Sequence, residues 1–158
     1  MSDERFNILA AGERRMLEAM LDFHRDALVR KTQGLDDETL RRSAVPSGTN
    51  LMGLVYHLKR AEQWWFEGCF AGRPFDGDPP REHTAPASAT YFDLVEDYRR
   101  QCDTSRAIAG AAELDDVAAN AFMKPTLRWV LAHMIEETAR HNGHADILRE
   151  LIDGHAGE

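Results

Sequence analysis

The stretch that decides the fold is R-W-V-L-A-H-M-I-E-E-T-A-R-H-N-G-H-A-D-I-L-R-E-L-I-D-G, residues 128–154. Apolar and small residues recur along it at helical spacing, at Val130, Met134, Thr138, Ala145, Leu148 and Ile152. Glu137 and His141 fall within the same arc, roughly 40° apart about the axis. An ionised carboxylate on the buried face of a helix is costly unless something compensates it. The stretch therefore predicts one long amphipathic helix that carries such a carboxylate.

The composition is that of an ordinary globular protein. The 158 residues, 43% of them hydrophobic and 29% charged, suit one domain spanning 1–158 with its own core. A formal charge of −8 argues against a nucleic-acid partner, and no apolar run is long enough to cross a membrane. The first residues do not resemble a signal peptide. Cys69 and Cys102 fall on inward stripes as small apolar residues, not as a disulfide framework. We expect a cytoplasmic protein.

Working outward from the last helix, the periodicity predicts further helices and a short helical turn, at residues 13–32, 51–71, 88–112 and 36–42. Thr49 or Asn50 is the expected cap of the second long helix. Strand-like alternation is absent. The pattern predicts an all-α fold, a four-helix up-and-down-type bundle whose core occupies about residues 13–154.

A connection rich in proline and glycine, residues 72–89, separates the second and third long helices. We interpret it as a long surface segment that edges the mouth of a site. His83 lies within it and is expected to be solvated.

The chemistry is expected where the last helix faces the second. Bundles build metal sites from inward-facing carboxylates and histidines. Glu137 and His141 supply two ligands, and His57, at the border of the second helix's apolar stripe, is the best-placed third. With a divalent cation, two imidazoles and one carboxylate leave a net charge near +1, which makes the buried carboxylate tolerable. Three protein ligands leave one position open, as in catalytic zinc sites. The alternative is a metal-free core that tolerates one Glu–His hydrogen bond.

Four other histidines compete for roles. His24 is either a core histidine with one hydrogen-bond partner or a residue facing the same site. His144 is interpreted as a residue that supports the metal ligands from behind or as a structural residue. His133 is expected on the flank of the helix and His155 in the frayed tail.

Two motifs resemble the actinobacterial branch of the DinB-like superfamily. They are H-M-I-E-E-T-A-R-H-N-G-H-A-D-I-L-R-E, preceded by L-R-W-V, and V-P-S-G-T-N-L-M-G-L-V-Y-H-L-K-R-A-E-Q-W-W-F. The resemblance implies a four-helix bundle with a central divalent metal. Many members carry histidine where Glu137 stands here. The related mycothiol-dependent maleylpyruvate isomerases use a His, Glu, His zinc triad, which corresponds to His57, Glu137 and His141.

The resemblance implies thiol chemistry, with mycothiol or bacillithiol as the co-substrate. The expected function is a zinc-dependent thiol S-transferase that detoxifies electrophilic small molecules, with Ni²⁺ or Mn²⁺ as other occupants of the site. The alternatives are a metal-binding module without catalysis and, ranked lower, a metal-assisted hydrolase. Three cations are candidate anchors for a substrate carboxylate, namely Arg30, Lys31 and Arg140. A monomer or a homodimer is expected.

Overall fold

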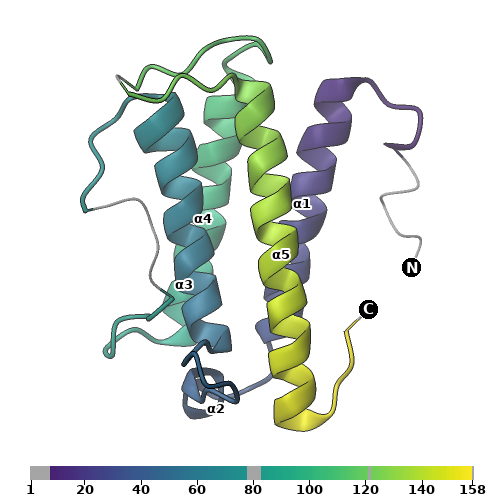
Figure 1. Ribbon diagram of the computed structural model, residues 1–158, viewed down its shortest axis with the longest axis vertical. Coiled ribbons are helices and arrows are strands. Elements are labelled where there is room, and N and C mark those ends of the chain that lie inside the picture. The colour runs from purple at the N-terminus through teal and green to yellow at the C-terminus, as the bar shows by residue number, and fades with distance from the viewer. Residues whose placement is uncertain (1–7, 78–82, 121, 158) are drawn as a thin grey trace.

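The computed structural model describes residues 8–77, 83–120 and 122–157, and this part of the chain is helical without a β-strand. The elements are α1 (Glu13–Thr32), α2 (Asp37–Arg41), α3 (Leu51–Glu62), the π-helix η2 (Gln63–Phe70), α4 (Tyr91–Gly110) and α5 (Leu127–Asp153). The predicted all-α fold is confirmed, and the long helices lie alongside one another (Figure 1). None of the described helices combines the length and apolar character needed to span a bilayer.

Side-chain caps set where most of these helices begin. The Asn50 carboxamide accepts from the backbone N–H of Gly53 at the start of α3. Thr90 caps α4 and Thr126 caps α5 in the same way, through their hydroxyl oxygens. Each cap satisfies a backbone donor that has no partner within its own helix. The α5 helix ends at Gly154, whose φ of 74° suits a residue without a Cβ.

The long connection after η2 is a crossover. The N–H of Tyr91, at the start of α4, donates to Asp37 Oδ1 of α2, 3.2 Å away. At the other end of α4, the Ala109 carbonyl accepts from Arg14 Nη1 near the start of α1. The α4 helix therefore runs parallel to α3, and the chain returns from the end of η2 to the opposite end of the bundle between them (Figure 1). A short loop would have made the two helices antiparallel.

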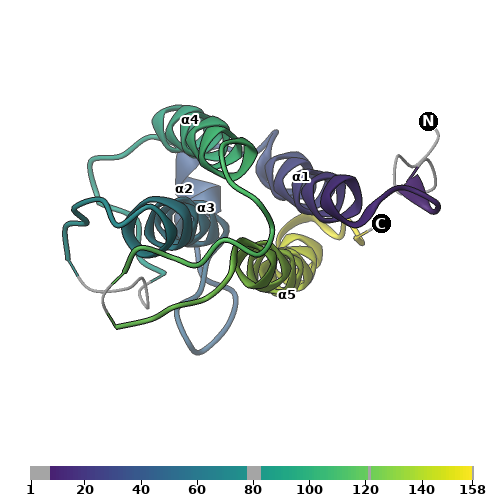
Figure 2. The same ribbon diagram turned by 90° about the horizontal axis from the view of Figure 1, so that it is seen from above.

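A polar layer divides the core. One hydrophobic cluster surrounds Leu28, Leu58 and Ala145, and a second surrounds Leu21, Phe66 and Met134. Between them lie the buried polar residues of the layer, Arg25, Glu62, Ser105, Thr138, His141 and Asn142. Seen from above, α3 and α5 are neighbours on one side of the bundle (Figure 2). The polar layer extends to the side of the bundle that α3 and α5 form, and it lies between these two helices there.

Candidate metal centre

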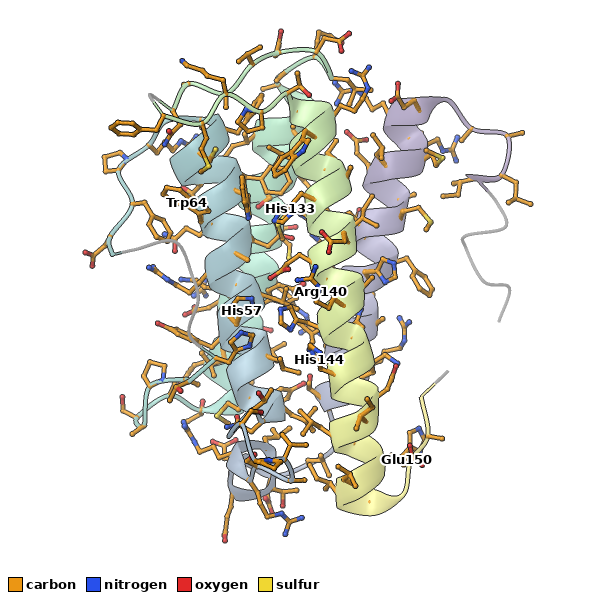
Figure 3. The ribbon with its side chains drawn as sticks, viewed as in Figure 1. His57, Trp64, His133, Arg140, His144 and Glu150 are labelled. Carbon is orange, nitrogen blue, oxygen red and sulfur yellow. The ribbon has the colours of Figure 1, made fainter. Side chains whose placement is uncertain are left out.

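The structure brings His57, Glu137 and His141 together across α3 and α5. Oε1 of Glu137 lies 3.0 Å from Nε2 of His57 and 3.2 Å from Nε2 of His141. The side chains of the two histidines are 4% and 6% exposed, and that of Glu137 is 15% exposed. Figure 3 shows His57 on α3 at the level of Arg140 and His144 on α5. The three side chains that the sequence selected thus converge on one point.

The spacing of these atoms fits a small divalent cation. In a tetrahedral zinc site with bonds of about 2.0–2.1 Å, neighbouring ligand atoms lie about 3.3 Å apart. The two distances to Glu137 Oε1 are close to this value. Imidazole nitrogens and a carboxylate oxygen are also the donors that zinc takes most often besides thiolates. The chemistry of the donor set therefore fits the metal that the resemblance implies.

Glu137 is held in its ionised form. Its hydrogen bonds with His141 and then with His57 lower the pKa of the carboxyl far below its usual range, against the opposing effect of burial. The second oxygen, Oε2, lies 3.4 Å from Nη1 of Arg140, which also pairs with Glu136. Glu137 therefore offers a negative charge to the cluster.

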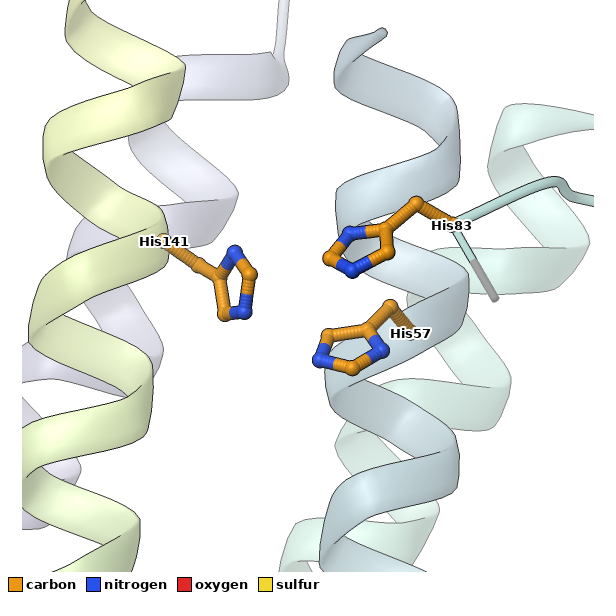
Figure 4. Close-up of side chains that lie close together, drawn as sticks. All are labelled: His57, His83 and His141. Carbon is orange, nitrogen blue, oxygen red and sulfur yellow. The ribbon is translucent and has the colours of Figure 1, made fainter. Parts of the chain in front are cut away.

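His83 is the functional candidate that sequence reasoning missed. The prediction that it is solvated is wrong, because it is half-buried and its ring stacks on that of His57, with centroids 4.1 Å apart and planes 11° apart. Ligand atoms of His57, His83 and His141 all lie within 4.8 Å of one another. Figure 4 shows the rings of His83 and His57 one above the other, facing His141. The cluster thus contains three imidazoles and one carboxylate.

A glycine admits the His83 backbone to the face of α3. A Cβ built on Gly53 would lie 1.8 Å from the carbonyl oxygen of His83, so a larger residue at this position would exclude the segment. Two residues further on, Ala85 is buried in the hydrophobic core. Gly53 lies one helical turn before His57. A glycine inside a helix costs stability and so indicates a packing reason, but it does not identify the segment that packs there.

Burial keeps the His83 imidazole neutral. Desolvation, followed by the nearby charges of His57 and His141, lowers the pKa of His83 to about 4. The Nδ1 atoms of His57 and His83 are buried, and neither has a hydrogen-bond partner in the described structure. A neutral imidazole keeps a lone pair for a cation, and a buried nitrogen without a partner is costly unless a ligand satisfies it.

The remaining histidines take different positions. Nδ1 of His144 lies 3.3 Å from Nδ1 of His141, next to the cluster. His24 contacts Phe23 edge to face, and its carbonyl accepts from the Asn142 side chain. That His24 or His144 supports the metal ligands stays a prediction. His133 stacks on Trp129 one turn before Glu137, and His155 is exposed after the end of α5.

The suggested carboxylate anchors are largely engaged elsewhere. Lys31 forms an ion pair with Asp146, and Arg140 pairs with Glu136 and Glu137. The guanidinium of Arg30 lies over the Phe23 ring, 5.8 Å from its centroid. Arg140 is thus the one of the three that contacts the cluster, through Glu137.

Comparisons with known proteins place the chain in a family. A crystal structure described as a conserved protein from Enterococcus faecalis is similar, with a TM-score of 0.66 at 15% identity over 89% of this chain and 97% of that chain. At that identity the likeness shows the fold alone. A comparison with curated proteins gave no match. The model of the mycothiol S-transferase family, which lies within the DinB-like superfamily, matches residues 16–154. The chain therefore belongs to the mycothiol S-transferase family.

Proposed function

We propose that this protein is a zinc-dependent S-transferase that joins the thiol of mycothiol to an electrophilic small molecule. The observation that carries the proposal is the meeting of His57 and His141 on Oε1 of Glu137, at distances that suit zinc ligands. Family membership supports the thiol as the co-substrate. A cytoplasmic location, where low-molecular-weight thiols stay reduced, belongs to the same proposal.

Each ligand has a separate task in this proposal. Glu137 lowers the net charge of a site that holds a divalent cation to about +1, which makes the cation tolerable in a mostly buried position. The two histidines would each supply a neutral imidazole nitrogen to the ion beside Oε1 of that carboxylate. Arg140 orients its other oxygen. When bound, zinc favours the thiolate form of a thiol that coordinates it, and the thiolate is the nucleophile.

The thiol must come from a bound molecule, because the chain's own cysteines are unsuited to attack. Cys69 and Cys102 are both buried. Burial raises the pKa of both thiols, and that of Cys102 reaches about 12. A neutral, inaccessible thiol is a poor nucleophile. This leaves the electrophile and an external thiol as the two small-molecule partners.

A second candidate function is supported by His83. If its imidazole is a fourth permanent ligand, the coordination shell is closed and the protein is a metal-binding module without catalysis. The position of the ring, stacked on His57 and within ligand range of His141, favours this alternative more than any other observation does. The two candidates differ in what happens when His83 is removed.

Two measurements separate them. Zinc-loaded protein should accelerate the reaction of mycothiol with an alkyl chloride, and His141→Ala should abolish the acceleration. His83→Ala should leave zinc affinity within about tenfold of wild type if three ligands hold the ion. A loss as large as that of His141→Ala, together with no acceleration by wild type, would establish the closed site instead.

A further inference from the structure

Three aromatic rings lie between the helices next to the candidate metal centre. They belong to Trp65 of η2 and to Trp129 and His133 of α5, and we call them the aromatic cluster. The centroid of Trp65 is 5.2 Å from that of Trp129 and 4.5 Å from that of His133. The rings of Trp129 and His133 are nearly parallel, with centroids 5.0 Å apart. None of these contacts is explained by metal binding.

The aromatic cluster follows the metal centre directly along the two helices. His133 precedes Glu137 by four residues of α5, a rise of about 6 Å. The α3 and α5 helices are antiparallel, because His57 meets Glu137 while Trp65, further along the chain, meets Trp129. The cluster thus adjoins the metal centre on the side toward the start of α5, as the position of His133 in Figure 3 shows.

The opposite side of the metal centre is occupied by the protein itself. The His83 backbone contacts α3 at Gly53, one turn before His57, and His144 follows His141 on α5. Both imidazoles therefore lie toward the end of α5. Along the two helices, the aromatic cluster is therefore the neighbouring surface that a molecule at the candidate metal centre would meet on the side toward the start of α5.

The π-helix rotates Trp65 into this position. In an uninterrupted α-helix, Trp65 would lie about 80° around the axis from His57. In η2 the bonds span five residues, as between the N–H of Ala71 and the carbonyl of Phe66, so each residue turns through a smaller angle. The wider turns bring Trp65 back toward α5. Such π segments are rare and are often found at functional sites.

The cluster is only partly covered, and the three arginines of α5 in the described structure are each paired with a carboxylate. Trp129 is 48% exposed and Trp65 is half-buried, so the rings keep free surface after contacting one another. Arg140, one turn beyond Glu136, is already paired with two carboxylates. Indole faces without an unpaired cation favour a flat, uncharged ring over an anion.

We propose that the aromatic cluster binds an uncharged aromatic group of the electrophile and so selects aromatic over aliphatic substrates. The selection among substrates rests on the proposed transferase function. The binding of an aromatic group does not. In the reaction, the mycothiol thiolate displaces a leaving group such as chloride from the electrophilic carbon. A C–S bond forms, the C–Cl bond breaks, and the thiol proton passes to solvent.

The binding test uses unreactive probes and requires neither metal nor catalysis. Acetanilide and N-methylacetamide differ only in the phenyl group. In NMR spectra, acetanilide should shift the indole N–H signals of Trp65 and Trp129 and leave that of Trp64, which contacts Phe75 instead, unchanged. N-methylacetamide should shift none of them. Equal shifts for Trp64, or no shift with acetanilide, would overturn the proposal.

The kinetic test uses the corresponding chloroacetamides with mycothiol and zinc-loaded protein. The ratio of kcat/KM for the phenyl compound to that for the methyl compound measures the preference. Trp129→Ala should reduce this ratio by about tenfold, which corresponds to the free energy of one aromatic contact. Trp129→Phe should retain most of the preference. Phe92→Ala removes a more exposed aromatic ring at the start of α4, away from the cluster, and should change nothing. An equal loss of preference in Phe92→Ala would contradict the proposal. If neither the wild type nor any variant transfers the thiol, the NMR shifts of the indole signals alone test the binding of the aromatic group.

Discussion

At the residue scale, Glu137 is the group that makes the arrangement of α3 and α5 unusual. A carboxylate on the inner face of a helix requires compensation. Two imidazoles and one guanidinium surround it in the structure. The two imidazoles lower the pKa of the carboxyl. Together with the guanidinium they are also the neighbours expected of a cation ligand with its supporting partners.

The first prediction concerns Glu137→Gln. The substitution keeps the shape of the side chain but removes its charge, so the affinity for zinc should fall by at least about 100-fold, more than the usual effect of a supporting residue. Competition with a chromophoric chelator measures the affinity. Glu136→Gln, which changes an exposed carboxylate one residue earlier, is the matched control and should have little effect. Equal affinities in the two variants would show that Glu137 is not a ligand.

The second prediction concerns Cys102. Its burial, with a further contribution from Glu62, raises the pKa of the thiol to about 12. At pH 8 only roughly one molecule in 10⁴ carries the thiolate, so in a Cys69→Ala background iodoacetamide should modify Cys102 only after denaturation. Mass spectrometry gives the extent. Modification of the native protein at the rate of a free cysteine would contradict the burial of this side chain.

The third prediction follows from the same raised pKa. In the unfolded chain the thiol ionises at its ordinary pKa near 9, whereas the folded thiol stays neutral. The stability contributed by the protonated thiol is therefore fully present below pH 9 and is lost as the pH rises from 9 toward 12. Urea unfolding across that range should show a smaller loss for Cys102→Ala than for wild type. Identical pH profiles would refute the shift.

At the scale of elements, the helices were predictable and the segment bearing His83 was not. Apolar periodicity and caps such as Asn50 depend on local chemistry, so they can be read from the sequence. Periodicity also placed Glu137 and His141 on one face of α5. The position of His83 depends instead on a non-local contact with Gly53. The hydrogen-bond pattern of η2 was equally unpredictable, because its residues also suit an α-helix.

The fourth prediction compares two glycines inside helices. Gly143→Ala meets no atom within 4 Å, so it should stabilise the protein by up to about 1 kcal/mol through helix propensity. Gly53→Ala should instead destabilise it, because the new methyl group displaces the His83 carbonyl and with it the buried Ala85. Urea unfolding measures both changes. An equal gain in both variants would mean that the segment does not pack on α3.

At the scale of the whole molecule, the polar layer contains a buried ion pair as well as His141 of the candidate metal centre. Arg25 of α1 donates from Nε and Nη2 to the two oxygens of Glu62, at 2.8 and 2.6 Å. The two side chains are 5% and 0% exposed. Glu62 follows His57 by five residues of α3, a rise of about 7.5 Å, so the pair lies further along the helix between the two hydrophobic clusters. The layer therefore fixes α1 and α3 relative to each other beside the site.

The fifth prediction tests that layer. Glu62→Ala leaves the Arg25 guanidinium buried without its partner and should cost about 3–5 kcal/mol of unfolding free energy. Glu96→Gln breaks an exposed pair with Arg99 on α4 and should cost much less. Chemical denaturation compares them. Similar losses would show that the buried pair is not a structural feature of the bundle.

The central claim is that His57, Glu137 and His141 hold a metal ion to which a thiol still has access. Cobalt(II) in place of zinc reports this directly, because a bound thiolate gives a sulfur-to-cobalt charge-transfer absorption. Mycothiol added to the cobalt-loaded wild type should produce this band, and His141→Ala should not show it under the same conditions. Binding of cobalt without any such band at saturating mycothiol would contradict the claim and indicate a closed site.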